Sequence, residues 1–519
     1  MSGRIDAGVL EGQTVDQDLD LTADVCIIGS GAGGAVTAWC LARAGLSVLV
    51  LEEGGYFTSP RFRMQEAEAY PDLYQEAATR TTADQSVSIY QGRCVGGGTV
   101  INWTTCFRLP ERVYEHWRKR HHVGDIDAAA LLPHYEAVEE RLGIRQVDLA
   151  TINHNNRALY DGCRALGWTA EPLRRNVRGC ARTGFCGLGC PIDAKQSMLV
   201  TYLPDAMDHG ATVLSRCRVE RLDFAAGQAT VAHGALLDAS GRDPTGCSVR
   251  VRAKRFVLAA GAIGTPALLL RSGAPDPHQL TGRRTFLHPV VVSAAAFAAP
   301  VDPFYGAPQS VASHHFADRG NEVGFFMESA PVHPVLMSTA FPQFGTDHRR
   351  EMGRIAHYAA HIALAIDGFR DDVEGGRVDV DEDGAPVLHY TPAPAVCRAF
   401  VVAQKSLAKA QLAAGAQRVS TLHNTPQVMR KMADVAALDG LDFGPGRLWM
   451  GSAHQMGGCA MGDDPRHAVV RSADLRHHHV DNVHVIDGSI FPTSLGVNPQ
   501  ETIYAHAHLI ATRLAQAWR

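Results

Sequence analysis

The stretch DVCIIGSGAGGAVTAWCLARAGLSVLVLEEGG, residues 24–55, decides the fold. Its residues 25–28 form a short apolar run rich in β-branched side chains, which predicts a buried parallel strand. A glycine-rich turn follows, and then an Ala- and Leu-rich helix over about residues 33–44 that ends at Gly45. Residues 47–51 predict a second strand. Strand, turn, helix and strand in this order form the βαβ unit that opens a doubly wound parallel sheet.

The turn carries the pattern G-x-G-x-x-G at Gly29, Gly31 and Gly34. The first glycine allows the tight turn, the second lets the backbone approach a pyrophosphate, and the third lets the helix pack on the sheet. Glu52 ends the second strand, at the place where an acidic side chain holds the two ribose hydroxyl groups. The pattern predicts a dinucleotide site for FAD or NAD, and the alternative is a glycine-rich loop without a ligand.

Length and composition bound the class of protein. The chain has 519 residues, of which 46% are hydrophobic and 20% charged, so we expect a folded protein of one to three domains. This apolar content excludes disorder, a collagen-like chain and a small disulfide-stapled fold. The net charge of −5 leaves no basic excess for phosphate contacts, so we expect no nucleic-acid partner. The 50 glycines exceed the usual share of ~7% and indicate tight turns or close backbone approach.

The cysteines and the apolar runs predict the compartment. We interpret the twelve cysteines as mostly reduced thiols of a cytoplasmic protein. The first residues show no basic region followed by an apolar run, so we predict no secretory signal. We expect no transmembrane segment, because no stretch reaches the ~18 apolar residues that a membrane helix needs.

Further elements follow from periodicity and turn residues. The segment RVDVDEDGAPVLHY alternates about an Asp-Gly turn and predicts a hairpin. The other predicted elements are a helix over 131–142, the hairpin over 377–390, a long helix over 395–414, a strand that runs into a glycine turn over 255–266, a strand over 483–486 and a last helix over about 499–517.

Four more segments narrow the choice of cofactor. They are GRCVGGGTVINWTTCFR (92–108), GAIGTPALLLRSG (261–273), SAHQMGGCAMG (452–462) and VIDGSIFPTSLGVNPQETI (485–503). Together with the first turn they resemble the glucose-methanol-choline (GMC) family of FAD-dependent oxidoreductases. The resemblance extends over nearly the whole chain, with the motifs in the family's order. It implies FAD as the cofactor and oxidation of an alcohol as the reaction.

The resemblance also assigns positions around the cofactor. It implies that one turn runs beside the flavin ring and the pyrophosphate, that an acid-glycine pair lies near the phosphates and the ribityl chain, and that one strand residue meets the adenine. These are Gly97, Gly98, Thr99 and Asn102 in the turn, Asp487 and Gly488 as the pair, and Val219 in the strand.

Two residues match the active-site positions of the family. His454, in H-x-x-G-G-x-x-M-G, matches its active-site histidine, and Asn498, in N-P-x-x-T, matches the second position, which is His or Asn. A histidine that titrates near neutrality can take the hydroxyl proton, and an Asn amide can donate to the developing alkoxide. Pro499 starts a helix whose N-terminus favours an anionic reduced flavin. The alternative for His454 is an ordinary surface or core histidine.

A cluster of cysteines needs a separate interpretation. In GCARTGFCGLGCPIDAKQS, Cys180, Cys186 and Cys190 are spaced C-x5-C-x3-C-P. Three thiolates this close could ligate an iron–sulfur cluster, although the complete ferredoxin spacing is absent. The spacing resembles the iron–sulfur-bearing catalytic subunit of bacterial FAD glucose dehydrogenases, and the whole segment resembles the family's long-chain alcohol oxidases. The alternative is three buried thiols in a glycine-rich loop near the flavin.

We therefore predict an α/β fold in which a doubly wound FAD-binding domain is interleaved with an α+β substrate domain that carries an antiparallel sheet. The predicted FAD-binding domain comprises 20–60, 90–110, 210–290 and 446–519, and the substrate-binding domain and cap comprise 111–209 and 291–445.

The predicted reaction is oxidation of a hydrophobic or long-chain alcohol, with hydride transfer to the flavin and His454 as base. A sugar dehydrogenase with an iron–sulfur relay and a hydroxynitrile lyase that uses FAD structurally are the alternatives. Oxygen, a quinone and a cytochrome all remain open as the electron acceptor.

Overall fold

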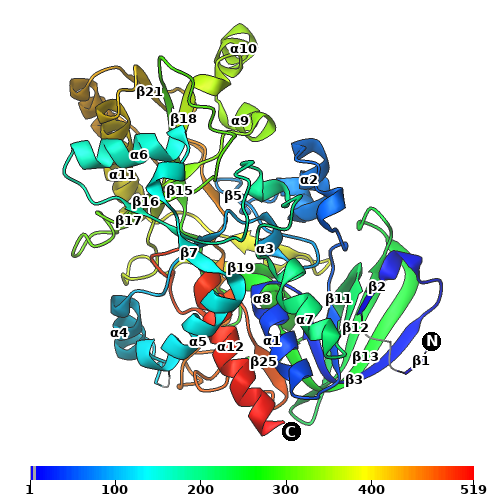
Figure 1. Ribbon diagram of the computed structural model, residues 1–519. Coiled ribbons are helices and arrows are strands. Elements are labelled where there is room, and N and C mark those ends of the chain that lie inside the picture. The colour runs from blue at the N-terminus through cyan, green and yellow to red at the C-terminus, as the bar shows by residue number, and fades with distance from the viewer. Residues whose placement is uncertain (1, 4–7, 125, 519) are drawn as a thin grey trace.

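The computed structural model describes residues 2–3, 8–124 and 126–518. A mostly parallel sheet and an antiparallel sheet form two regions, each with its own helices (Figure 1). The chain passes between them several times, so each region contains segments far apart in sequence. The predicted α/β fold class is confirmed. The predicted domain boundaries remain a prediction.

The first βαβ unit forms as its residues predict. Strand β3 (Leu19–Ile28) leads through the glycine turn into helix α1 (Ala32–Arg43), and β4 (Val48–Leu51) follows. Strands β3 and β4 pair in parallel, and Ile28 lies opposite Leu51. Both strands are buried at these ends because layers of structure cover both faces of the sheet.

The sheet around this unit collects strands from the whole chain. Its order is β11-β12-β13-β3-β4-β10-β2, with β25 paired in parallel to β13 and β1 to β3. Strands β11, β12 and β13 form an antiparallel meander. The bounds are β1 (Ser2–Gly3), β2 (Gly8–Glu11), β10 (Thr212–Ser215), β11 (Cys217–Ala225), β12 (Gln228–Leu237), β13 (Pro244–Leu258) and β25 (Val483–Val485).

The register of this sheet aligns the strand ends that matter for function. Leu258 pairs with Ile28 on one side and with Val485 on the other. The carboxyl ends of β3, β4, β13 and β25 therefore lie level along one edge. Ligands of doubly wound sheets bind at this edge, where loops follow the strands.

Helices cover the parallel sheet. The last helix, α12 (Gln500–Ala517), lies beside α1, and α5 (Ala128–Leu142) packs against α12 (Figure 1). The hydroxyl of Tyr135 on α5 lies 3.2 Å from that of Thr502 on α12. The predicted helices over 131–142 and 499–517 are confirmed.

The second sheet is antiparallel through its main path, β22-β21-β15-β18-β17-β16-β8. Helices α11 (Pro394–Ala413) and α6 (His154–Ala165) pack on one of its faces. The predicted hairpin is also confirmed, as β19 (Gly376–Val380) and β20 (Pro386–His389). The bounds of the sheet strands are β8 (Glu171–Pro172), β15 (Val290–Ala296), β16 (Val311–Ser313), β17 (Phe325–Ala330), β18 (Tyr358–Ala365), β21 (Arg418–Thr421) and β22 (Val428–Met429).

Shorter elements complete the two regions. They are α2 (Glu66–Leu73), α3 (Gly98–Ile101), α4 (Glu111–Arg120), α7 (Tyr202–Asp208), α8 (Gly261–Arg271), α9 (Pro334–Ala340), α10 (Gly345–Met352), β5 (Ser88–Ile89), β6 (Thr105–Cys106), β7 (Ile144–Gln146), β9 (Arg174–Asn176), β14 (Arg283–Phe286), β23 (Gly451–Ser452) and β24 (Met456–Gly457).

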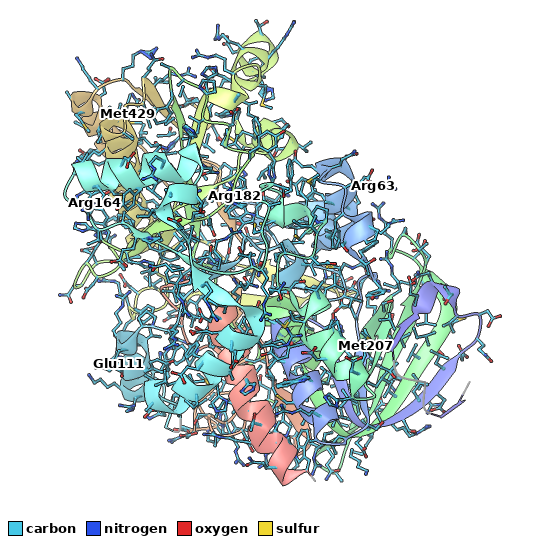
Figure 2. All side chains as sticks on the ribbon, viewed as in Figure 1. Arg63, Glu111, Arg164, Arg182, Met207 and Met429 are labelled. Atoms are coloured by element: carbon cyan, nitrogen blue, oxygen red, sulfur yellow. The ribbon has the colours of Figure 1, made fainter. Side chains whose placement is uncertain are left out.

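Side chains pack densely within both regions (Figure 2). One apolar core surrounds the parallel sheet, and a second lies between the antiparallel sheet and its helices. Among the described residues, no helix is both long enough and apolar enough to cross a membrane.

Candidate active site

One large cavity lies between the carboxyl edge of the parallel sheet and a face of the antiparallel sheet. Its volume is about 1330 Å³, above the ~300–1,000 Å³ of a common ligand pocket. The predicted site residues that line it are Gly29, Gly31, Glu52, Gly97, Gly98, Thr99, Asn102, Val219, His454, Asp487, Gly488, Asn498 and Pro499. The structure thus brings together residues from every motif of the sequence. Gly34 alone among the predicted cofactor residues is absent from the lining.

The first glycine turn meets the second and the third through backbone contacts. Gly29 has φ +103°, and a Cβ atom there would lie 2.3 Å from the carbonyl oxygen of Ala259. A Cβ atom on Gly97 would lie 2.8 Å from Cα of Gly31, and one on Gly34 would lie 2.0 Å from the oxygen of Gly29. Side chains at these positions would separate the turns. Gly34 therefore packs inside the turn, which explains why it does not line the cavity.

Gly33 is a packing position that the sequence pattern did not single out. A Cβ atom there would lie 1.8 Å from the carbonyl oxygen of Ile486, just beyond β25. Helix α1 thus approaches the last strand of the sheet through Gly33. The adjacent glycines Gly33 and Gly34 were the only sign of this packing position in the sequence pattern of the turn.

Glu52 ties two of the glycine turns together. Its carboxylate accepts hydrogen bonds from the backbone N–H of Ser30 (3.0 Å), from the Ser30 hydroxyl (2.6 Å) and from the N–H of Gly54 (2.8 Å). The N–H of Gly96 in turn donates to the Ser30 hydroxyl at 2.9 Å. Burial raises the pKa of Glu52, and these donors oppose the shift. The carboxylate organises the turns and also lines the cavity.

Asp487 caps a helix rather than pointing freely into the cavity. One carboxylate oxygen accepts from the N–H of Gly261 (2.9 Å) and the hydroxyl of Thr265 (2.6 Å), at the start of α8. The other oxygen accepts from the N–H (2.8 Å) and the hydroxyl (2.5 Å) of Ser489. Burial raises its pKa against these four donors. Its bonds hold the loop after β25 against α8, beside Gly488.

The turn that contains Asn102 is fixed from two sides. The Asn102 amide donates to Gln500 at 2.6 Å, and Gln500 donates to the carbonyl of Thr105 at 2.6 Å. From the other side, the buried Lys195 ammonium donates to the carbonyls of Val100, Asn102 (3.0 Å) and Cys186 (2.7 Å). Burial lowers the pKa of Lys195 to about 8. Lys195 was missed from the sequence, where it gave no signal beyond its place in the AKQS segment.

These features fit FAD. Glycines line the cavity where α1 begins, and α1 has no side-chain cap at Gly31, so its first N–H groups are available to a pyrophosphate. At the adjoining Gly98, a Cβ atom would meet no other atom within 4 Å, which leaves room beside the turn. Val219 lines the same cavity from β11. The volume of the cavity and its glycine lining suit a dinucleotide.

At the other end, His454 and Asn498 lie together. Nε2 of His454 is 3.4 Å from Nδ2 of Asn498, and Asn498 donates to the carboxylate of Glu328 at 3.3 Å. Glu328 is fully buried, and burial raises its pKa to about 8. Its Oε1 has no hydrogen-bond partner within the protein. Glu328 was missed from the sequence, where the signal was a single acid in the apolar strand FFMESA.

A second histidine lies behind His454. Nδ1 of His288 is 3.2 Å from Nδ1 of His454, and the N–H of Gly496 donates to Nε2 of His288 at 3.1 Å. His288 is fully buried and holds a left-handed backbone with φ 44°. The carboxylate of Asp367 accepts from its backbone N–H at 3.2 Å. Burial lowers the pKa of His454 to about 4 and that of His288 well below its ordinary value.

The wall opposite the glycine turns is apolar. Alternate residues of β15, β17 and β18 face the cavity, as the two-residue period of a strand requires. The intervening residues pack beneath α11 in the second core. The apolar lining on this side comprises Trp103, Val290, Val292, Ala330, Leu336, Met337, Ala340, Ala360, Ile362, Leu364, Leu422 and Trp449.

The three predicted cluster ligands lie on a separate, smaller cavity. Cys180, Cys186 and Cys190 all line it, together with Lys195. Each sulfur accepts a hydrogen bond from a nitrogen at 3.4–3.5 Å. Yet in the part of the chain that the structure describes, no group of three His, Cys, Asp or Glu side chains is arranged to hold a metal ion. An iron–sulfur cluster at these thiols is therefore not shown and stays a prediction.

Comparison with known proteins identifies the family of the chain. Residues 70–290 and 373–507 match the two family models described as GMC oxidoreductase. The chain belongs to the GMC oxidoreductase family. Residues 27–68 also match the model of the NAD(P)-binding Rossmann-like domain, in agreement with the βαβ unit.

Relatives and solved structures place the chain within this family. An uncharacterized GMC-type oxidoreductase of Mycobacterium tuberculosis is 35% identical over 94% of this chain and 75% of its own length. A long-chain-alcohol oxidase of Arabidopsis thaliana is 28% identical over 96% of this chain and 68% of its own. The crystal structure of pyridoxine 4-oxidase from Mesorbium loti shares the fold, with a TM-score of 0.68 and 21% sequence identity. The match covers 94% of this chain and 98% of the oxidase chain. This GMC protein is an FAD-dependent oxidoreductase.

Proposed function

We propose that this GMC oxidoreductase oxidises a hydrophobic, long-chain alcohol. The observation that carries the proposal is the apolar wall on β15, β17 and β18, which meets His454 and Asn498 at one end of the cavity. An alkyl chain gains free energy from leaving water for such a wall, about 0.8 kcal/mol for each buried methylene group. The likeness to a long-chain-alcohol oxidase supports the same substrate class.

The proposed chemistry places the reacting carbon near His454 and Asn498. FAD, when bound, supplies the acceptor for the hydride that leaves this carbon. Asn498 can donate to the alcohol oxygen as negative charge develops on it. Its neighbour Pro499 is the N-cap of α12, which has no side-chain cap, so the helix N-terminus favours negative charge nearby. His454 and Glu328 are the two titratable groups beside Asn498 that can take the hydroxyl proton.

We propose that FAD is held by the glycine-lined half of the cavity. The turns around Gly29, Gly31, Gly97 and Gly98 would hold its pyrophosphate, and Thr99 and Asn102 would lie beside the flavin. Val219 would meet the adenine and Glu52 the ribose. Asp487 and Gly488 would shape the wall beside the ribityl chain.

An alcohol panel tests the proposal. Purified protein loaded with FAD is mixed without oxygen with primary and secondary alcohols of increasing chain length, and the visible absorbance of the oxidised flavin is followed. We expect rapid bleaching by long-chain alcohols and much slower bleaching by short alcohols and sugars. Repeating the panel with oxygen, a quinone or a cytochrome identifies the acceptor. The substrate proposal fails if sugars reduce the flavin as fast as long-chain alcohols do.

The same measurements separate the alternatives. An iron–sulfur dehydrogenase requires iron and acid-labile sulfide in protein purified without oxygen, and we expect neither. A hydroxynitrile lyase would turn over its substrate while the flavin stays oxidised.

A further inference from the structure

The hydrogen bonds behind His454 determine which of its nitrogen atoms carries the proton. A backbone N–H can only donate, so the bond from Gly496 requires Nε2 of His288 to be without a proton. A neutral His288 then carries its proton on Nδ1. This proton points to Nδ1 of His454 at 3.2 Å, so His454 must accept there and carry its own proton on Nε2.

Both histidines are neutral in this arrangement: His288 is fully buried, and His454 lines the cavity with its side chain partly exposed. Their lowered pKa values, caused by burial, agree with that state. The backbone of His288 is itself held by Asp367, which accepts from the N–H groups of Leu287 (3.1 Å) and His288 (3.2 Å). The hydroxyl of Tyr390 also donates to Asp367 at 2.9 Å. His288 is therefore fixed on both its backbone and its ring.

Two N–H donors then meet at the reacting end of the cavity. Nε2 of His454 and Nδ2 of Asn498 are 3.4 Å apart, a long contact in which the role of Nε2 depends on the tautomer of His454. With Nε2 protonated, both nitrogen atoms are donors and neither satisfies the other. They can both donate to one oxygen atom placed between them. Such a donor pair stabilises the negative charge that develops on an alcohol oxygen as its hydride leaves.

A protonated Nε2 cannot take the alcohol proton, so another group must accept it. Glu328 contacts the same Asn498, lines the cavity and keeps Oε1 without a protein partner. Its Oε2 accepts from Gln309 at 2.8 Å, and the Thr105 hydroxyl fixes Gln309 by donating to its oxygen at 2.6 Å. An ionised Glu328 thus has two amide donors on one oxygen and a free second oxygen.

We infer that His288 is a positioning residue that makes His454 a hydrogen-bond donor to the alcohol oxygen, and that Glu328 accepts the alcohol proton. The inference rests on the proposed alcohol oxidation. The O–H bond breaks and its proton passes to Oε1 of Glu328. The C–H bond breaks and its hydrogen leaves with the electron pair to the bound flavin. The carbon–oxygen double bond forms, and the donor pair holds the oxygen throughout.

The pH profile distinguishes the two candidate bases. Glu328 must be ionised to accept a proton, and its pKa is raised to about 8. The residues opposite it on β16 and β18 are Ala312 and Ile362, which do not titrate. Its remaining contacts are the amides of Gln309 and Asn498, with His454 beyond the latter. With Glu328 as the base, we expect kcat/KM to rise with pH and to level off above about 8. With His454 as the base, whose pKa is about 4, kcat/KM would instead stay constant as the pH approaches 8.

Matched variants test each part. Glu328→Gln should bind FAD and lose about 10²–10⁴-fold in the rate of flavin reduction. Glu322→Gln, the same change on an exposed loop before β17, should leave the rate unchanged. For His288, a Gln can accept from Gly496 and donate to His454, so His288→Gln should keep most of the rate. His288→Leu can do neither and should lose about 10²-fold in kcat with FAD still bound.

The tautomer is measured directly by ¹⁵N NMR of FAD-loaded protein labelled at histidine, with the His454→Gln variant assigning the signal. We expect His454 to be protonated at Nε2 in wild-type protein and in His288→Gln, and to lose this preference in His288→Leu. A proton on Nδ1, a flat pH profile, or a fully active Glu328→Gln would each overturn the inference. Absence of flavin reduction by every alcohol in wild-type protein would instead defeat the proposed function, while the NMR result would still decide the tautomer.

Discussion

The two halves of the cavity are built by different means. The glycine half, formed by the turns after β3, β4, β5, β13 and β25, lines the cavity with backbone and with glycines, several of which have no room for a side chain. The apolar half, on β15, β17 and β18, presents side chains from one face of an antiparallel sheet. A binding site made of backbone atoms requires glycine at a few positions with fixed spacing in the sequence. A side-chain wall can change residue by residue while the sheet stays the same, so we propose that the apolar half determines specificity for the substrate.

The largest effect is expected in the glycine half, at Gly33. A Cβ atom in Gly33→Ala would lie 1.8 Å from the Ile486 oxygen, a backbone atom that cannot move without the sheet. We expect a loss of about 3 kcal/mol or more in stability, and FAD content near zero. Thermal unfolding and flavin absorbance measure both.

Gly440→Ala is the matched control, because no atom lies within 4 Å of its added Cβ. It should leave the unfolding temperature and the FAD content unchanged. A Gly33→Ala protein that matches this control would show that backbone contact does not define the glycine half.

In the apolar half, a comparable change should alter specificity more than stability. Ala360→Phe adds a ring to the wall on β18. We expect kcat/KM for long-chain alcohols to fall at least tenfold, about 1.4 kcal/mol in transition-state binding, while short alcohols are affected less. Chain-length profiles of flavin reduction measure the shift. A uniform loss at every chain length would mean that this wall does not contact the alkyl chain.

Lys195 anchors the turn at Asn102 in the glycine half, and its effect is expected to be moderate and pH-dependent. The folded pKa of about 8 lies below the ordinary 10.5, so the unfolded chain binds more protons between these values. Stability contributed at this site therefore rises with pH across that window. Relative to Lys195→Met, wild-type protein should gain in unfolding temperature as the pH rises from about 8 to 10.5.

The control is Lys409→Met on α11, for which no such trend is expected. Lys195→Met should also bind FAD more weakly, because the turn at Asn102 loses one of its anchors. A pH trend shared by both variants would contradict the role of the buried ammonium group.

The smallest effect is expected at the cysteine cavity. A protein with Cys180, Cys186 and Cys190 all changed to Ser should retain most of its flavin reduction by alcohol, since no metal-binding arrangement forms there. Stopped-flow reduction with and without an artificial acceptor makes the comparison. If the variant reduces its flavin normally but no longer passes electrons to the acceptor, the result would support the iron–sulfur cluster hypothesis.

The residues of the glycine half could be selected from the sequence because the constraints on them are local. Positions such as Gly29 and Gly34 are dictated by turns within a few residues, and their spacing is visible in one segment. His454 and Asn498 were found through motifs of the same kind. Their exact roles remain proposals.

The apolar half was less visible because its constraints are set between distant segments. Glu328 meets Asn498 only after β17 packs against the start of α12, 170 residues away in sequence. His288 acquires its function from the N–H of Gly496, which no local pattern predicts. Lys195 is likewise defined by carbonyls of a turn nearly 100 residues earlier. A lone polar residue in an apolar strand was the available signal for Glu328.

The central claim is that the two halves act together, with the glycine half holding FAD and the apolar half delivering an alcohol to it. The most direct measurement is the reduction of bound FAD, without oxygen, by a long-chain primary alcohol and by the same alcohol carrying deuterium at the hydroxyl-bearing carbon. We predict that both bleach the flavin and that deuterium slows the bleaching, because the C–H bond breaks in that step. Product formation with the flavin still oxidised would contradict the account.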